Sequence, residues 1–284
     1  MMTMVQAAGF SDIGQVRKVN EDCFLLNEPI GLYVVADGMG GHRGGEVASR
    51  LAVKTIDAYM AAAADKSPVE KNMLSADGAS EASERLRKSI YLANREIYKQ
   101  SLQESTLRGM GTTVSALYLT GDAIITANVG DSPIYLLRNG EIENLYTPHT
   151  LLHERKKIPK SMEGKFSKGK LAHILTRAVG IRTEVGVDYV ETQCFTDDIV
   201  VLCSDGLSGK ITRDEIRDLV YQNDSDAACK KMTDLANQRG GEDNITVIVV
   251  RIQSANGHAN KGLFRRMLGI PAWIVSLFRP KSRS

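Results

Sequence analysis

The chain of 284 residues lacks the sequence features of secreted, disulfide-stabilised or membrane-spanning proteins. It has only four cysteines, and no two of them form a CxxC pair. Cys203 lies inside an apolar run, where a thiol behaves as a small hydrophobe, so we expect free thiols and a reducing cytoplasm. The N-terminus has no basic region followed by an apolar core, so we expect no secretory signal.

The chain also lacks a large excess of positive or negative charge, since its formal net charge is only +2. Residues 257–284 contain six Lys or Arg and no Asp or Glu, which leaves about −4 for residues 1–256. Nucleic-acid binding needs clustered cations, so a mildly acidic body excludes nucleic acid as the main partner.

Three aspartates stand where an apolar run meets a glycine-containing turn. They are Asp37 after residues 32–36, Asp205 after residues 199–204, and Asp243 before residues 245–250. A carboxylate in such a turn is free of side-chain crowding and can be aimed at a hard cation, and Gly38 lets a backbone carbonyl approach the same ion. Acidic residues at the mouths of three expected strands can converge on one cluster of ions, so the sequence predicts a metal enzyme. All-oxygen ligands favour Mg²⁺ or Mn²⁺ over Zn²⁺.

Apolar and period-two runs outnumber helical patterns and predict strands near 31–36, 112–119, 123–129, 133–138, 199–203 and 245–252. Asn139-Gly140 predicts a tight hairpin after one of them. Helical spacing of apolar residues predicts helices over 46–60, 81–102 and 225–239, and Thr212 with Glu215 forms a capping-box pattern before another. Residues 61–80 are expected to form a long connecting loop. The fold class is therefore α+β, with helices covering antiparallel sheet.

Two segments differ from this pattern. Residues 147–178 are rich in lysine and poor in apolar residues, as expected of a mobile surface flap or active-site lid. Residues 257–284 combine cationic flanks with Trp273, Phe264 and several leucines, but are too short and interrupted for a spanning helix. We expect one domain over 1–256 and a tail over 257–284 that either packs on the body or docks on an anionic membrane or a protein partner.

Near the N-terminus, Arg17 precedes the acidic pair Glu21 and Asp22. Alone this pattern is weak, because a charged turn before a strand explains it equally well. Beside three strand-end aspartates it gains a chemical meaning. The planar fork of Arg17 matches a phosphate dianion, and the two carboxylates could hold metal-bound waters.

Seven blocks together resemble the metal-dependent protein phosphatases, the type 2C serine/threonine phosphatases, in their bacterial form. The resemblance covers about residues 5–252, and the blocks occur in the family's order. They are Arg17-x-x-Asn20-Glu21-Asp22, Asp37 to His42, Gly109 to Thr113, Val129 to Ser132, Leu175 to Gly180, Ser204 to Gly206 and Glu242 to Thr246.

The resemblance implies a β-sandwich of two antiparallel sheets flanked by pairs of helices, and a residue-by-residue site. Asp37 would bridge two Mn²⁺ or Mg²⁺ ions, and the carbonyl of Gly38 would bind one of them. Asp205 and Asp243 would hold the other, and Asp131 would help to bind a third, weaker ion. Glu21 and Asp22 would position waters in the metal shell, and Arg17 would grip the substrate phosphate. A metal-activated water would then hydrolyse phosphoserine or phosphothreonine.

The chain departs from the family pattern at two positions. Met39 stands where eukaryotic relatives have a histidine that is thought to protonate the leaving oxygen, which leaves a metal-bound water or His42 for that role. Pro133 stands where the family usually has arginine, a change expected to alter a surface contact without removing metal binding.

Structural explanations exist for several of these residues taken singly. Asp131 before Ser132-Pro133 suits a turn, Asp205 could cap the turn that follows it, and Glu46 at a helix start suits the helix dipole. His42 suits a supporting role or a helix start better than catalysis. The glycines and threonines of 109–113 are expected to be structural.

Other phosphatase chemistries fail on spacing. None of the four cysteines has arginine six positions later, as a cysteine nucleophile requires, and neither Asp-x-Asp-Gly nor Gly-Asn-His-Glu occurs. The expected function is therefore hydrolysis of phosphorylated proteins in the cytoplasm by a monomer that opposes a serine/threonine kinase, with the tail able to hold it at the inner membrane surface. The alternative is a catalytically weak, metal-dependent module that binds phosphoproteins.

Overall fold

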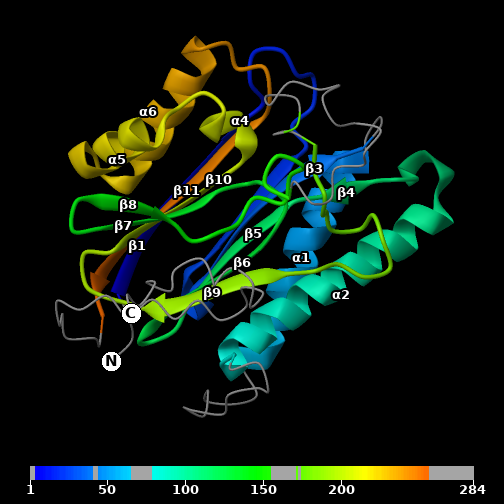
Figure 1. The fold of residues 1–284 in the computed structure, drawn as a ribbon, viewed down its shortest axis with the longest axis horizontal. Helices are drawn as coiled ribbons and strands as arrows, with labels where there is room; N and C mark the ends of the chain where they lie inside the picture. The colour runs from blue at the N-terminus through cyan, green and yellow to red at the C-terminus, as the bar shows by residue number, and fades with distance from the viewer. Residues whose placement is uncertain (1–3, 41–43, 65–78, 155–170, 172–173, 256–284) are drawn as a thin grey trace, which may run out of the picture.

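The computed structural model describes residues 4–40, 44–64, 79–154, 171 and 174–255 (Figure 1). The tail at 257–284, His42 and most of the segment 147–178 lie outside these ranges. In the described part of the chain no helix is both long and apolar enough to cross a bilayer.

Two antiparallel sheets form the centre of the molecule. The first has the order β1 (Met4–Asp12), β11 (Ile245–Ser254), β10 (Ile199–Cys203), β7 (Ile134–Arg138) and β8 (Glu141–Asn144). The second has the order β2 (Asp22–Asn27), β3 (Leu32–Met39), β5 (Val114–Leu119), β6 (Ala123–Val129) and β9 (Asp188–Gln193), and β4 (Gly111–Thr112) pairs with the end of β3. This confirms the expected sandwich of two antiparallel sheets.

Helices cover both outer faces of the sandwich (Figure 1). On the second sheet lie α1 (Gly44–Ala64) and α2 (Glu81–Gln103), and on the first lie α4 (Asp205–Ser208), α5 (Arg213–Gln222) and α6 (Ser225–Gln238). Single turns of 3₁₀ helix, η1 (Glu28–Ile30) and η2 (Ser105–Leu107), complete the described elements. The side chains of Ser80 and Asp224 cap the N-termini of α2 and α6, and Thr212 with Glu215 forms the predicted capping box before α5.

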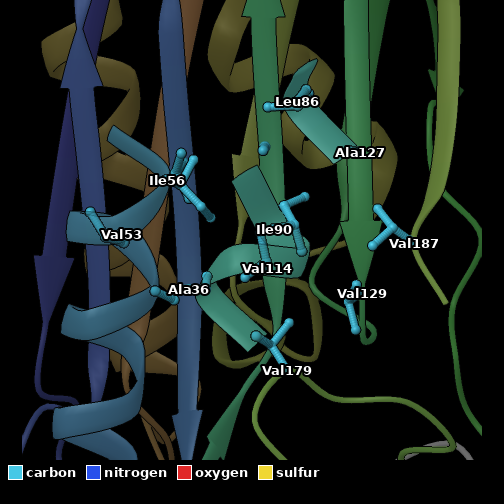
Figure 2. Close-up of a cluster of buried hydrophobic side chains, with 14 of the residues drawn as sticks. Ala36, Val53, Ile56, Leu86, Ile90, Val114, Ala127, Val129, Val179 and Val187 are labelled. Atoms are coloured by element: carbon cyan, nitrogen blue, oxygen red, sulfur yellow. The ribbon is translucent and has the colours of Figure 1, made fainter. Parts of the chain in front are cut away.

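The alternation of side chains along each strand divides the core into three layers. Along β3, Leu32, Val34 and Ala36 face α1 and α2, while Tyr33 and Val35 face the other sheet. Figure 2 shows the helix-facing layer, where Val53 and Ile56 of α1 and Leu86 and Ile90 of α2 meet Ala36, Val114, Ala127 and Val129 of the sheet. The first sheet repeats this arrangement, with Val201 and Val249 facing α5 and α6 and Val200 and Ile248 facing the sandwich interior.

The face between the sheets changes character at one end of the sandwich. Tyr33 and Val35 are apolar, but the next inward position on β3 is Asp37. On β2 the inward-facing Phe24 and Leu26 are preceded by Asp22, which has the same parity. Strand alternation therefore delivers carboxylates to the edge of an apolar interior, and this edge contains the candidate site.

Most expected elements are confirmed, and the exceptions have physical reasons. Residues 61–64 continue α1, where a loop was expected, because an alanine-rich run favours helix. Strands β1 and β9 were not predicted; both lie at sheet edges and are only partly buried, so their apolar periodicity is weak. Pro133 is buried, so the prediction of an altered surface contact there was wrong.

Candidate active site

The site begins with two aspartates on neighbouring strands. Asp22 of β2 and Asp37 of β3 are directly opposite in the antiparallel register. Each residue keeps some exposed surface, but protein atoms surround both carboxyl groups. Burial disfavours the charged form of a carboxyl group, and two such groups at one pair of positions also repel each other.

The charges of three further carboxylates, Asp205, Asp243 and Asp131, act on this pair. Burial first, and then the charges of Asp22, Asp205, Asp243 and Asp131, hold the pKa of Asp37 well above its ordinary value. Burial also raises the pKa of Asp22 to about 7, aided by the charges of Asp205 and Asp243 and opposed by hydrogen bonds from Thr246 and Ser204. The structure thus brings together all the aspartates that the sequence predicts to bind metal.

Asp205 and Asp243 come from adjacent ends of β10 and β11. Ser204 is the N-cap of α4 and Asp205 is its first residue, so the alternative explanation of Asp205 as the cap of this turn was wrong. The two strand ends are tied together, since Ser204 N–H donates to the Thr246 carbonyl at 3.0 Å and Thr246 N–H donates to Ser204 Oγ at 2.9 Å. This pairing fixes the position from which each carboxylate extends.

Asp131 lies in the turn between β6 and β7. Its neighbour Ser132 is buried, and Ser132 Oγ lies 2.7 Å from Thr113 Oγ1. Thr113 Oγ1 in turn accepts a hydrogen bond from the N–H of Asp37 at 3.1 Å. The structural role expected of the segment 109–113 therefore has a specific form: its threonines support the backbone of Asp37, and Thr112 Oγ1 donates to the Asp37 carbonyl at 2.9 Å.

Glu21 is held by the first turn of α1. Its carboxylate accepts backbone hydrogen bonds from Gly45 and Glu46, although burial outweighs these bonds and raises its pKa. A Cβ atom on Gly45 would lie 2.7 Å from the Glu21 carboxyl group, so only glycine permits this approach. The helix N-terminus favours a negative charge at this position.

Arg17 lies at the exposed rim of the cluster. Its guanidinium Nη2 donates to Asp243 Oδ2 at 2.8 Å, and about half of its side chain is exposed (49%). The charges of Glu21 and Asp37 also act on it. A planar cation at the edge of an acidic cluster is placed to hold an anion that binds beside the cluster.

Asn244 organises the rim, although sequence reasoning gave it no role. Its side-chain Oδ1 accepts from the N–H of Glu21 at 2.9 Å, and its Nδ2 donates to the carbonyls of Ile13 at 2.9 Å and Val19 at 3.1 Å. These bonds fix both ends of the loop that carries Arg17. The only sequence signal was its position directly after Asp243.

The donor set fits a divalent cation bound partly through water. Glu21 Oε1 and Asp22 Oδ2 are buried and accept no hydrogen bond, which is costly unless a bound group or water satisfies them. Within the described ranges no three acidic, histidine or cysteine side chains are already drawn into the cage of one ion. The carboxylates raise one another's pKa values without forming a closed cage within the described residues, and hard cations commonly complete an oxygen shell with water.

The comparisons with known proteins agree with this geometry. The protein phosphatase 2C family matches residues 16–248. Serine/threonine phosphatase stp of Listeria monocytogenes is 36% identical over 250 residues, covering 84% of this chain and 93% of the relative. Protein phosphatase PhpP of Streptococcus pneumoniae is 32% identical over 247 residues, covering 84% and 94%.

Solved structures have the same fold. The Mycobacterium tuberculosis serine/threonine phosphatase PstP/Ppp superposes with a TM-score of 0.72 at 27% identity, covering 88% of this chain and 99% of that chain. The catalytic domain of PstP in complex with two manganese ions gives a TM-score of 0.72 at 30% identity, covering 87% and 97%. The chain described here belongs to the protein phosphatase 2C family.

Proposed function

We propose that the acidic cluster between the two sheets is the metal centre of a serine/threonine protein phosphatase, which hydrolyses phosphoserine and phosphothreonine on proteins. The observation that carries this proposal is the meeting of Asp22, Asp37, Asp205 and Asp243 around buried, unsatisfied carboxylate oxygens, with Arg17 at the rim. Family membership and the names of the relatives support the activity.

In this proposal the ions are Mn²⁺ or Mg²⁺. Asp37 with the Gly38 carbonyl, and Asp205 with Asp243, would hold two ions, and Asp131 would help to hold a weaker third. Glu21 and Asp22 would position waters around the ions. Bound divalent cations supply a Lewis acid that makes water a nucleophile near neutral pH. The two manganese ions in the PstP complex support this choice of metal.

The residues of the chain supply position and charge. Arg17 leaves Asp243 in part to form a bidentate contact with two phosphate oxygens, which fixes the phosphorus above the cluster. Asn244 holds the loop of Arg17 in place, and the apolar interior below Asp37 excludes water from the far side of the carboxylates. Phosphoryl transfer depends mainly on such positioning and on stabilisation of charge on the equatorial oxygens.

The partners proposed here are phosphorylated proteins and the serine/threonine kinase whose action this protein reverses. We further propose that the protein is a monomer, that residues 1–256 form the phosphatase domain, and that it acts in the cytoplasm. No disulfide joins the four cysteines, which suits that compartment. Docking of residues 257–284 on an anionic membrane or on a protein, and control of substrate choice by residues 147–178, belong to the same proposal.

The experiment is phosphate release from a phosphothreonine peptide with Mn²⁺, with EDTA, and with Asp205→Asn in Mn²⁺. Turnover only by the unchanged protein with metal supports the phosphatase and assigns it to this site. Binding of Mn²⁺ and of phosphopeptide without turnover would instead identify a metal-dependent phosphoprotein-binding module. Turnover that survives both EDTA and the substitution would refute the proposed centre.

A further inference from the structure

His149 is a buried histidine that makes reciprocal hydrogen bonds with the turn before Asp131. Its side chain and backbone are fully buried, with 0% of its surface exposed. The N–H of His149 donates to the Gly130 carbonyl at 2.9 Å, and the N–H of Gly130 donates to His149 Nδ1 at 3.1 Å. Gly130, which directly precedes Asp131, is thus held by His149 through both its N–H and its carbonyl.

The bond from Gly130 fixes the tautomer of His149. Nδ1 accepts a hydrogen, so the neutral ring carries its proton on Nε2. Nε2 lies 3.1 Å from Asp188 Oδ2, off the direction of an ideal hydrogen bond. Arg177 Nη1 donates to Asp188 Oδ1 at 2.6 Å, and its Nη2 donates to Glu154 Oε1 at 2.8 Å. The imidazole of His149 therefore lies next to a network of ion pairs.

Asp131 therefore lies between two anchors. On one side Ser132 is bonded to Thr113, which supports the N–H of Asp37. On the other side Gly130 is bonded to His149. Gly130 has a φ of +109°, and a Cβ atom there would lie 2.6 Å from Thr113 Cγ2, so no other residue fits this turn and no side chain of its own can stabilise it. The acceptor that completes the turn comes from His149, 19 residues away.

We propose that His149 is a positioning residue for the Asp131 carboxylate, and that it acts through Nδ1 and the Gly130 N–H rather than through Asp188. The inference rests on the proposed function, in which Asp131 binds the weakest ion. Partners that orient ligating groups commonly change metal affinity by about 10–100-fold when they are removed. The affinity of that weakest ion is therefore the quantity that His149 controls.

Two amide substitutions distinguish the roles of the two ring nitrogens, Nδ1 and Nε2. His149→Asn places an acceptor near the position of Nδ1 and loses the contact with Asp188, whereas His149→Gln places its amide near Nε2 and loses the acceptor for Gly130. Mn²⁺ binding is measured by titration calorimetry and by electron paramagnetic resonance, with Asp131→Asn as the reference. We expect His149→Gln to weaken the weakest Mn²⁺ site about tenfold or more, as Asp131→Asn does, and His149→Asn to stay within about threefold of the unchanged protein.

The conformation of the turn can also be monitored in the metal-free protein. In EDTA, the amide NMR signals of Gly130 and Asp131 should shift in His149→Gln and stay near their original positions in His149→Asn. Val220→Ala in α5, remote from the site, controls for a general loss of stability. It should lower the melting temperature and leave Mn²⁺ binding unchanged.

Three results would overturn the inference. These are wild-type Mn²⁺ binding by His149→Gln while Asp131→Asn loses the weakest site, equal loss of binding by both His149 variants in step with their melting temperatures, or loss in His149→Asn alone, which would assign the effect to Asp188. Failure of the proposed function looks different. If Asp131→Asn binds Mn²⁺ normally while the amide signals still follow the expected order, the ion assignment of Asp131 is wrong and the positioning of its turn by His149 stands.

Discussion

Asp22 and Asp37 occupy directly opposed positions on β2 and β3 and share the face that looks into the sandwich. Their carboxyl groups have raised pKa values because burial and neighbouring acidic charges both oppose ionisation. A fold that holds such a pair together without a cation does so at an electrostatic cost. The fold thus gives up some stability to keep a binding site preformed, a trade common at functional sites.

The first prediction concerns this cost. Asp37→Asn removes one of the mutually repelling charges, so the metal-free protein should become more stable while phosphate release in Mn²⁺ falls to background. A gain of 1 kcal/mol corresponds to a rise of about 2–4 °C in melting temperature for a domain of this size. Calorimetry in EDTA, with phosphate release in parallel, tests both effects. Asp214→Asn, whose side chain is 76% exposed, is the control and should change neither. A lower metal-free melting temperature for Asp37→Asn would contradict the repulsion.

The second prediction concerns pH. Asp22 has a pKa of about 7 in the folded protein against 3.8 ordinarily, so the folded state binds a proton that the unfolded state has lost over this interval. The stability from this proton is complete below about pH 4 and disappears as the pH rises to about 7, with a slope of up to about 1.4 kcal/mol per pH unit. Melting temperatures in EDTA between pH 5 and 8 should fall more steeply for the unchanged protein than for Asp22→Asn.

Mn²⁺ should reverse this dependence, because a cation favours the ionised carboxylates. The increase in melting temperature caused by a fixed excess of Mn²⁺ should therefore grow from pH 5 to pH 8. Parallel curves for the unchanged protein and Asp22→Asn in EDTA would show that Asp22 does not titrate in this range.

The third prediction concerns Arg17. Arg17→Lys keeps the charge but loses the planar fork, so kcat/KM for a phosphothreonine peptide should fall about 10–100-fold. The melting temperature should stay within about 1–2 °C, since the pair with Asp243 is about half exposed and such pairs contribute little. Arg50→Lys, with a side chain 69% exposed on α1, provides the matched control. Unchanged kinetics in Arg17→Lys would remove Arg17 from the phosphate site.

The fourth prediction separates the rim from the rest of the fold. Asn244→Ala removes three bonds to backbone groups of the Arg17 loop and should lower stability by about 1–3 kcal/mol while raising KM. Asn94→Ala is a close match, because Asn94 is also buried and also makes three side-chain bonds to backbone groups. It should cost similar stability and leave KM unchanged. Equal kinetic defects in the two variants, measured below their melting temperatures, would mean that Asn244 acts only through stability.

The aspartates of the site were predictable because their signal is local. Asp37, Asp205 and Asp243 adjoin continuous apolar runs, and the structure brings all three to one edge of the sandwich. The central strands carry the same local signal and were predicted for that reason. Strand β1 was missed because its ladder with β11 joins residues more than 230 positions apart, and its own alternation is weak.

The supporting residues were not predictable in the same way. Asn244 and His149 bond to backbone groups distant in sequence, and Ser132 bonds to the side chain of Thr113, so no spacing pattern marks them. Pro133 was expected to alter a surface contact, yet it is buried and its carbonyl accepts the N–H of Cys203 at 3.1 Å. Local patterns identified groups suited to bind ions and phosphate, whereas the contacts that hold those groups depend on the tertiary fold.

The register of β1 and β11 has a consequence for attachment. Asp12 is paired with Ile245 beside the acidic cluster, and Met4 is paired with Ser254 at the opposite end of the same two strands. The described chain therefore begins and ends about nine residues of strand away from the acidic cluster, or roughly 30 Å. A fusion partner, an affinity tag or an anchoring surface joined at either of these ends would be attached at the end of the sandwich opposite the acidic cluster. The cluster would then stay accessible to phosphorylated proteins.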